Sequence, residues 1–373
     1  MRYDAIVVGL GGMGSAALYH LARRGQRVLG IDQFTPPHAF GSSHGASRII
    51  RLAYYEHPSY VPLLRRAYEL WRELEGESGE QLLTITGSLD ISARDDRIVQ
   101  GSLTSCEEHG IPHELLSAAE LSRRYPAWRL PSDFAAVYQR DGGILAPEQC
   151  VAAHLRCAAK RGAELLLEEE VLWIDGRRDH PVVRTAKGEH EAEHVVIAAG
   201  AWTDKLLPQF RELVVAERQV VGWFTPTEAS VFEAMRFPVF NVEVEEGHYY
   251  GFPLDSAGVK VGRYHHRGEV VDPSGYDRAV HAADEEVLRR FVSRYLPAAD
   301  GAMMKAETCL FENSPDEHFI IDRLPEIPGA VIAAGFSGHG FKFCSVVGEV
   351  LAGFSDGTFV GVQLFETSRF RAR

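Results

Sequence analysis

The stretch that decides the fold is Ala5-Ile-Val-Val-Gly-Leu-Gly-Gly-Met-Gly14, close to the start of a chain of 373 residues. Its four leading apolar residues are typical of a buried β-strand, and they run into a turn with the spacing G-x-G-x-x-G. Apolar residues then recur at helical spacing until Gly25, and a second apolar segment over 27–31 ends on Asp32. This order of strand, glycine turn, helix, strand and acid predicts a βαβ unit that binds a dinucleotide.

Each glycine of the turn has a separate physical role. Gly9 allows the tight turn, Gly11 lets the backbone approach a diphosphate, and Gly14 permits close packing of the helix on the strand. The N-terminus of the helix supplies free N–H groups for the anion, and Asp32 can bind the hydroxyl groups of a ribose. These features do not distinguish FAD from NAD, so that choice depends on the rest of the chain.

The composition narrows the class of protein. Hydrophobic residues make up 45% of the chain and charged residues 24%, which is typical of a globular enzyme-sized protein. A formal net charge of −13 argues against nucleic acid or an anionic membrane as a partner. The five cysteines are widely spaced without a CxxC pair, so we expect neither a disulfide framework nor a metal site. With no signal peptide and no apolar run of about 20 residues, we expect a cytoplasmic protein that does not span a membrane. The sequence does not reveal the oligomeric state, for which we expect a monomer.

Further along, the pattern is that of two interleaved units. Helices are expected over 59–75, 147–162 and 343–354, and strands over 82–91, 135–138, 164–175, 194–199 and 330–334. Residues 214–260 alternate and are rich in aromatic side chains, which is typical of antiparallel sheet. Because strand–glycine–helix pieces occur at the start, middle and end, we expect an α/β (α+β) fold in which a Rossmann-like domain is interleaved with an antiparallel-sheet domain.

Four stretches of the chain carry a resemblance to a known family. They are Gly41-Ser-Ser-His-Gly-Ala-Ser-Arg-Ile-Ile-Arg51, Tyr249-Tyr-Gly-Phe-Pro253, Cys309-Leu-Phe-Glu-Asn-Ser-Pro-Asp-Glu-His-Phe-Ile-Ile-Asp322 and Gly335-Phe-Ser-Gly-His-Gly-Phe-Lys342. In their order and spacing they resemble the monomeric sarcosine oxidase and N-methyltryptophan oxidase family of FAD-dependent amine oxidases, across essentially the whole chain. The resemblance implies a discontinuous FAD-binding domain and a substrate domain, for which we expect the boundaries 1–80 + 143–215 + 306–373 and 81–142 + 216–305.

The same resemblance implies that FAD is attached covalently, through a thioether to Cys309. Judged alone, a single cysteine after an apolar stretch is usually an inert core thiol, and for Cys344 that packing role is preferred. The resemblance also assigns cofactor contacts, some of them to residues that the glycine motif already points to. The expected cofactor-binding residues are Gly9, Gly11, Gly14, Asp32, Ser43, His44, Arg48, Val171, Cys309, Gly338, His339, Gly340 and Lys342.

An amino-acid substrate needs a cation for its carboxylate, and arginine offers a planar donor with two prongs. Taken alone, Arg48 and Arg51 could be a solvated or ion-paired helix face. The resemblance assigns the carboxylate to Arg51 together with Lys342, and places Arg48 beside the flavin ring. It also implies that Lys342 promotes the reaction with oxygen, because a compact ammonium stabilises the charge of superoxide.

Three further residues are expected at the catalytic site. The family places a histidine a few positions beyond Lys260, but the spacing here is about one residue longer, so His265 and His266 both qualify. Since adjacent strand residues point to opposite faces, only one of them should line the site unless a bulge intervenes, and we choose His265. Lys260 is a candidate catalytic residue, although a solvated strand lysine would look the same, and Tyr250 is expected to line the substrate pocket.

The expected activity is therefore the oxidation of sarcosine or another small N-methyl amino acid by O2, giving an amino acid, formaldehyde and hydrogen peroxide. One departure bears on the substrate: the sarcosine oxidases of the family carry a tyrosine two residues after the attachment cysteine, where this chain has Phe311. Three alternatives stay open at this point. They are an oxidase of a bulkier secondary amine such as N-methyltryptophan or pipecolate, a flavoprotein dehydrogenase that does not use O2, and a non-catalytic flavin-binding subunit.

Overall fold

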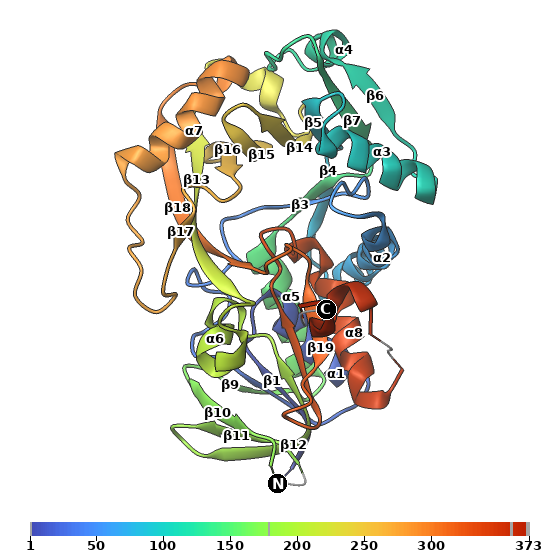
Figure 1. The fold of residues 1–373 in the computed structure, drawn as a ribbon, viewed down its shortest axis with the longest axis vertical. Helices are drawn as coiled ribbons and strands as arrows, with labels where there is room; N and C mark the ends of the chain where they lie inside the picture. Colours follow the sequence, from blue (N-terminus) through green and yellow to red (C-terminus); the bar gives the residue numbers. More distant parts are fainter. Residues whose placement is uncertain (1, 178–179, 359–360, 371–373) are drawn as a thin grey trace.

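The computed structural model describes residues 2–177, 180–358 and 361–370, and it has two halves, each built on a large β-sheet (Figure 1). The lower half contains an eight-stranded sheet in the order β10-β11-β12-β1-β2-β9, with β20 paired to β12 and β19 paired to β20. Its strands are β1 (Tyr3–Val8), β2 (Val28–Ile31), β9 (Glu164–Leu166), β10 (Val171–Asp175), β11 (Val182–Thr185), β12 (Glu189–Ile197), β19 (Ile320–Arg323) and β20 (Ala330–Ala334). The parallel pairs β12–β1, β1–β2, β2–β9 and β12–β20 confirm the expected Rossmann-like arrangement.

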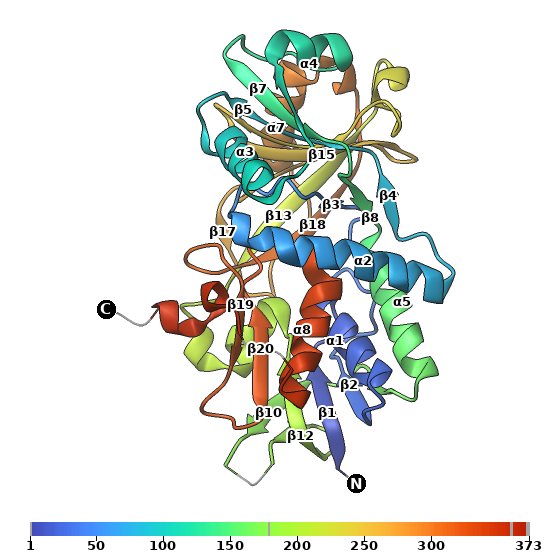
Figure 2. The same ribbon diagram turned by 90° about the vertical axis from the view of Figure 1, so that its right-hand side faces the viewer.

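Three helices pack together against the parallel strands: α1 (Gly12–Arg23), α5 (Pro147–Lys160) and α8 (Cys344–Asp356). Figure 2 shows α1 and α8 side by side, although their residues lie more than three hundred positions apart in the chain. Gly348 permits this approach, since a Cβ at that position would lie 2.5 Å from the backbone of Ala16. The N-termini of both helices consequently reach the same end of the sheet, where β1, β12 and β20 finish.

The upper half contains a nine-stranded sheet in the order β17-β13-β16-β15-β14-β5-β7-β6, with β18 paired to β13. Its strands are β5 (Ser88–Ala93), β6 (Glu114–Ser117), β7 (Phe134–Gln139), β13 (Val215–Phe224), β14 (Val239–Val244), β15 (Gly247–Asp255), β16 (Gly258–Arg263), β17 (Glu269–Val270) and β18 (Met303–Asn313). All of these pairs are antiparallel except β14–β5. Helices α3 (Arg97–His109), α4 (Ala118–Arg124) and α7 (Ala282–Tyr295) cover this sheet.

Two features join the halves. The long pair of β13 and β18 keeps register from Val215↔Asn313 at the lower end to Trp223↔Lys305, so both strands pass from one half into the other. Helix α2 (Val61–Ser78) crosses between the two sheets (Figure 2), beside a three-stranded sheet of β3 (Arg48–Ile50), β8 (Gly143–Leu145) and β4 (Leu83–Ile85). Because β18 is continuous across residue 306, the expected domain boundary there falls within a strand, and the boundaries remain a prediction.

Some expected elements are wrong in detail. Residues 164–175, expected as one strand, form β9 and β10 at opposite edges of the sheet, because β9 pairs with β2 and β10 with β11. Residues 82–91 hold parts of two strands in different sheets. His265 and His266 were expected on a strand, but β16 ends at Arg263 and His265 has a positive φ of 53° in the turn that follows. Among the described residues, no helix is both long enough and apolar enough to cross a membrane.

Candidate cofactor and substrate sites

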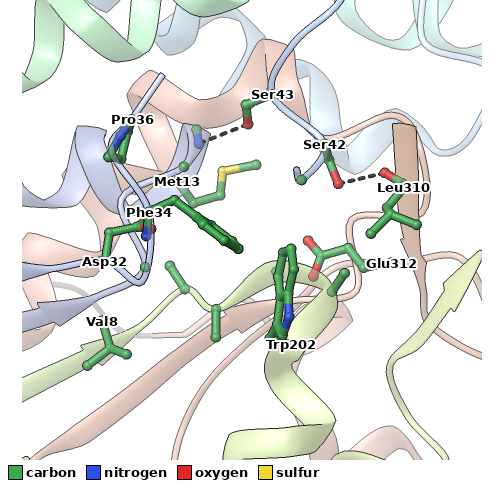
Figure 3. Close-up of a pocket in the computed structure, with 18 of the residues that line it drawn as sticks. Val8, Met13, Asp32, Phe34, Pro36, Ser42, Ser43, Trp202, Leu310 and Glu312 are labelled. Atoms are coloured by element: carbon green, nitrogen blue, oxygen red, sulfur yellow. Dashed lines mark hydrogen bonds between the residues drawn. The ribbon is translucent and has the colours of Figure 1, made fainter. Parts of the chain in front are cut away.

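A deep cavity opens where the lower sheet ends, between the glycine turn, the loop after β2 and the strand β18 (Figure 3). Its lining joins residues from the start, middle and end of the chain, as the interleaved pattern predicts. Eight of the expected cofactor residues line it: Gly9, Gly11, Asp32, Ser43, Arg48, Val171, Gly338 and Gly340. Five others do not line this cavity: Gly14, His44, Cys309, His339 and Lys342.

The glycine turn meets the requirements of a bound diphosphate. Gly9 has a φ of +85°, and a Cβ at Gly14 would lie 1.7 Å from the carbonyl oxygen of Gly9. At Gly11 the nearest atom to such a Cβ is the Ser43 Oγ, 3.7 Å away, so the backbone faces the cavity without a close neighbour. The start of α1 therefore presents its N–H groups to the cavity, where the partial positive charge of a helix N-terminus attracts an anion.

Two polar side chains hold this turn. Ser43 Oγ accepts the N–H of Gly12 at 3.0 Å, which ties the loop after β2 to the start of α1 (Figure 3). Asp32, at the end of β2, accepts the N–H of Leu10 at 2.7 Å and that of Phe34 at 2.8 Å. Its side chain is buried at the wall of the cavity, so the carboxylate both fixes the loop and lies where a ribose would bind.

The far wall of the cavity is formed by Arg48 and β18. Arg48 Nη2 donates to the carbonyl of Ser42 at 2.6 Å and Nη1 donates to the carbonyl of Ser47 at 2.8 Å. Ser42 Oγ donates in turn to the carbonyl of Leu310 at 2.6 Å, so the loop is joined to β18 (Figure 3). These contacts leave a guanidinium fixed beside the cavity, as expected for a residue beside the cofactor ring.

Phe311 also lines the cavity, and its ring explains the glycine in the loop after β20. A Cβ at Gly338 would lie 2.2 Å from that ring, and Gly338 has a φ of +76°. A side chain at Gly338 would therefore displace the aromatic wall. His44, which does not line the cavity, is buried, with its Nδ1 3.6 Å from Glu307 Oε2.

Beyond Arg48 lies the first buried lysine. Lys260 is 1% exposed, and its Nζ donates to the carbonyl of Gly45 at 2.6 Å and to that of Ser47 at 3.1 Å. Burial, together with the charge of Arg48, lowers the pKa of Lys260 to about 7, while Cys309 acts in the opposite sense. The pKa of the buried Cys309 thiol is raised by burial, although Arg48 and Lys260 oppose that rise. Lys260, Arg48 and Cys309 therefore belong to one electrostatic cluster at the end of the cavity.

A second cationic cluster surrounds Arg51, whose side chain is 1% exposed. Arg51 Nη2 lies 2.9 Å from both carboxylate oxygens of Glu56, and its Nε lies 3.5 Å from Asp90 Oδ1. Burial alone would raise the pKa of Glu56, but the charge of Arg51 lowers it to about 2. The guanidinium also lies over the rings of Tyr54 and Tyr55, 4.7 and 4.4 Å from their centres. Arg51 is thus a buried cation already bound to a carboxylate, and the interpretation as a solvated surface arginine is wrong.

Lys342 belongs to this second cluster. It lies in the turn Phe341–Phe343 immediately before α8, and its Nζ donates to the carbonyl of His339 at 2.6 Å. Burial, with the nearby charge of Arg51, lowers the pKa of Lys342 to about 7. His339 is held by the Tyr54 hydroxyl at 2.6 Å and by the carbonyl of Glu317 at 2.9 Å. The loop that lines the cofactor cavity therefore continues directly into the cationic cluster.

The two histidines have opposite surroundings. His266 is fully buried away from the cavity, with its Nε2 3.1 Å from Asp284 of α7. His265 is partly exposed between two carboxylates, with Glu217 at 2.9 Å from Nδ1 and Glu317 at 3.1 Å from Nε2. The hydrogen bonds to Glu217 and Glu317 raise the pKa of His265 to about 9. At neutral pH this ring is protonated, so it is unsuited to act as a base, and its expected catalytic role stays a prediction.

Tyr250 and several aromatic residues that sequence reasoning missed fill the space between the two clusters. The ring of Tyr250 lies 5.2 Å from that of Tyr264, and Tyr264 stacks on His248 at 4.2 Å. Tyr264 also reaches the ring of Phe311 at 5.8 Å, so it connects the cofactor cavity to the substrate side. Tyr264 directly precedes the two candidate histidines in the chain.

The cavity and the diphosphate turn, with buried cations beside them, define a dinucleotide-binding enzyme. The chain belongs to the FAD dependent oxidoreductase family, whose model matches residues 4–353. It is 44% identical to the monomeric sarcosine oxidase of Streptomyces avermitilis, over 94% of this chain and 92% of the relative. It is 34% identical to an N-methyl-L-tryptophan oxidase of Yersinia pestis, with both chains fully covered. Among solved structures, L-proline dehydrogenase from P. horikoshii has the same fold, with a TM-score of 0.85 at 23% identity, covering 99% of this chain and 98% of that one.

Proposed function

We propose that this protein is an FAD-dependent oxidase of sarcosine or another small N-methyl amino acid. The observation that carries the proposal is the buried pair of cations, Arg51 and Lys342, next to the loop that lines the cofactor cavity. Isolated charges are costly to bury, and a chain keeps them where they bind an opposite charge. The similarity to sarcosine oxidases over nearly the whole chain supports an amino acid as the source of that charge.

The substrate carboxylate would bind in place of the Glu56 carboxylate. The contact with Glu56 shows that Arg51 can bind a carboxylate, since one guanidinium nitrogen donates to both carboxylate oxygens at 2.9 Å. Lys342 is a second cation whose charge acts on the same carboxylate, because it also lowers the pKa of Glu56. Two cations and a desolvated pocket also lower the pKa of the substrate amine, which keeps its lone pair free for oxidation.

The chemistry that FAD would supply here is a two-electron oxidation of the N-methyl carbon, with the electrons going on to O2, so that amine, O2 and water would give the amino acid, formaldehyde and hydrogen peroxide. The residues of this chain hold and orient the two partners. The start of α1 would bind the diphosphate and Asp32 the ribose. Arg48 and Phe311 line the far end of the cavity. Cys309 lies in the cluster beside Arg48 at that end, which supports the thioether attachment proposed for it.

Two buried lysines are candidates for the reaction with oxygen. Lys342 has that role in the sequence-based interpretation, but its amine lies in the Arg51 cluster. Lys260 belongs instead to the cluster of Arg48 and Cys309, where the ring would be attached. Since electrostatic stabilisation of superoxide falls with distance from the ring, we assign oxygen activation to Lys260 and carboxylate binding to Lys342.

The activity is tested on purified protein in two steps. Anaerobic addition of sarcosine should bleach the flavin absorbance at about 450 nm, and admission of air should restore it with release of hydrogen peroxide. Parallel titrations with N-methyl-L-tryptophan and L-pipecolate separate a small-substrate oxidase from one for bulkier amines. Reduction by sarcosine without peroxide in air would show a dehydrogenase, and no reduction by any of the three would refute the proposal.

The covalent attachment is tested by acid precipitation. Yellow colour should stay with the pellet of the wild-type protein and move to the supernatant for Cys309→Ala. Cys344→Ala is the matched control, because Cys344 is the thiol that lines the cavity. Release of colour from the Cys344→Ala pellet alone would transfer the attachment to that residue.

A further inference from the structure

One buried acid in the cofactor cavity has no role in the chemistry described above. Glu312 lies on β18, three residues after Cys309, and its side chain is 8% exposed. Figure 3 shows its carboxyl group pointing into the cavity, between Trp202 and the end of β18. Its Oε2 is buried and has no hydrogen-bond partner among the residues that the structure describes. A polar atom in this position is retained where a bound molecule completes its hydrogen bonds.

The backbone of Glu312 is held by hydrogen bonds to two neighbouring segments. Glu312 pairs with Ala216 across the ladder of β13 and β18, and its carbonyl accepts the N–H of Ser337 at 2.9 Å. Its carboxyl is approached by the N–H groups of Gly335 and Phe336, which lie at the end of β20. The acid is therefore held between two strands with one oxygen left for a ligand.

Burial favours the neutral form of Glu312. Burial raises the pKa of Glu312 to about 8, and the N–H groups of Gly335 and Phe336 oppose this only in part. No cation lies within ion-pair distance of it in the described part of the chain. In the described part of the chain, the other charged or titratable side chains that line the cavity are Asp32 and His38 after β2, Arg48 on β3, Glu169, Glu170, Lys205 on α6 (Thr203–Leu206) and Cys344 at the start of α8. Glu217 of β13 is hydrogen-bonded to His265.

The position of Glu312 in the cavity determines which part of the cofactor would lie beside it. The diphosphate belongs at the start of α1 and the flavin ring near Cys309 and Arg48, so the sugar-alcohol chain of FAD runs between them. An ionised carboxylate in this place would repel the diphosphate, whereas a carboxylic acid donates a hydrogen bond to an oxygen. We infer that Glu312 is a positioning residue for FAD, whose protonated carboxyl donates a hydrogen bond to the chain of hydroxyl and phosphate oxygens that joins the two ring systems.

This inference rests on the proposed binding of FAD, and its test separates the two. In a Cys309→Ser background, where binding becomes reversible, the dissociation constant of FAD is measured by flavin fluorescence across a pH series. FAD affinity should be constant at low pH and fall about tenfold per pH unit once the carboxyl ionises. Glu312→Gln, which keeps a neutral donor, should bind FAD within about threefold at neutral pH and lose the pH dependence. Glu312→Leu, which has no donor, should bind about tenfold more weakly at every pH.

The matched control is Glu243→Gln, which changes a half-buried acid of β14 outside the cavity and should leave the pH profile unchanged. On the wild-type holoenzyme, the infrared carbonyl band of a protonated carboxylic acid should be present at neutral pH and disappear in Glu312→Gln. A pH dependence that survives in Glu312→Gln, or wild-type affinity in Glu312→Leu, or absence of the band would each overturn the inference. Failure of every variant and the wild type to bind FAD would refute the cofactor assignment instead.

Discussion

The cofactor cavity and the Arg51 cluster are built in different ways, although they lie next to each other. The cavity is made by main chain: a glycine turn, helix N-termini and loops, with Asp32 and Ser43 bonded to backbone N–H groups. The Arg51 cluster is made by side-chain charges, in which one guanidinium contacts Glu56 and Asp90 and lies over two tyrosine rings. Binding in the first depends on backbone shape, and binding in the second depends on charge balance.

Substitutions in the two regions should therefore have different effects. In the cavity, an added methyl group is the damaging change, because the backbone must approach the ligand. In the cluster, loss of a charge is the damaging change, since each charge is buried and its partner would remain unpaired. Loss of function should therefore appear as weaker FAD binding for the first region and as weaker substrate turnover for the second.

Arg51→Met should have the largest effect. It removes the proposed anchor of the substrate carboxylate, and loss of a buried charge pair costs about 2–5 kcal/mol. Since about 1.4 kcal/mol corresponds to a factor of ten, kcat/KM for sarcosine should fall roughly a thousandfold. Steady-state peroxide formation measures this, with the flavin content as a check that the cavity is intact.

Glu56→Gln is the matched change on the other side of the same pair. It keeps the shape of the side chain but removes the charge that competes for Arg51, so KM for sarcosine should fall severalfold. An unchanged KM in Glu56→Gln, or retained turnover in Arg51→Met, would show that Arg51 binds Glu56 for stability and does not bind the substrate. Thermal unfolding of both variants separates a folding defect from a binding defect.

The two buried lysines should differ in the reaction that they affect. Lys260→Met should slow reoxidation of the reduced protein by O2 about a hundredfold, with little change in anaerobic reduction, because removing one preorganised charge typically costs about that factor. Lys342→Met should instead raise KM and slow reduction. Stopped-flow measurement of the two half-reactions decides between them, and the reverse pattern would restore oxygen activation to Lys342.

Because the pKa of Lys260 is about 7, wild-type reoxidation should slow as the pH rises through that value.

Gly14→Ala tests the region that is built from backbone. The added Cβ would lie 1.7 Å from the carbonyl of Gly9, so the turn must shift and the helix N-terminus with it. Overpacking of this kind costs about 1–3 kcal/mol, which predicts FAD binding about tenfold to a hundredfold weaker in a Cys309→Ser background. Gly25→Ala is the control for general destabilisation, because its φ of +77° strains an alanine while no atom lies within 4 Å of the added group. Equal loss of FAD in both variants would contradict the role of the turn.

The same contrast explains how much could be predicted from sequence. The βαβ unit was predictable because its glycines, its helix and Asp32 act within 28 consecutive residues, and each has a local physical reason. The Arg51 cluster was predictable only in part. Its cations came from resemblance, whereas Asp90 and Glu56 are ordinary acids in sequence and become partners only when β5 and the segment after β3 meet.

The failures at His265 have the same origin. Strand alternation was assumed over residues that form a turn, and the partners that define the ring, Glu217 and Glu317, lie 48 and 52 positions away. Glu312 was missed for a related reason: its apolar neighbours indicate a buried strand, but sequence does not show that one face of that strand opens on a cavity. Burial and charge pairing between distant segments therefore mark the limit of local patterns.

The smallest expected effect concerns His265, and it separates a charged bridge from a catalytic base. The hydrogen bonds to Glu217 and Glu317 raise its pKa from 6.5 to about 9, so the folded protein keeps a proton that the unfolded chain releases. That stabilisation is fully present below about pH 6.5 and is lost as the pH rises through about 9. The side chain is 42% exposed, so solvent screens the pair and the effect is modest. Wild type should therefore have a higher Tm than His265→Asn at about pH 6, and the difference should vanish near pH 10.

Thermal unfolding at several pH values measures this, and activity measured alongside gives the functional answer. If His265 bridges two carboxylates, His265→Asn should keep most of its kcat at neutral pH, because a protonated ring held at both nitrogens has no lone pair with which to accept a proton. His281→Asn, which removes the pair of an exposed histidine with Asp277 but keeps a side chain that can cap the start of α7, is the control for a general loss of charge. A large fall in kcat with an unchanged pH profile of Tm would make His265 a catalytic residue, and it would place the substrate beside Glu317 and away from Arg51.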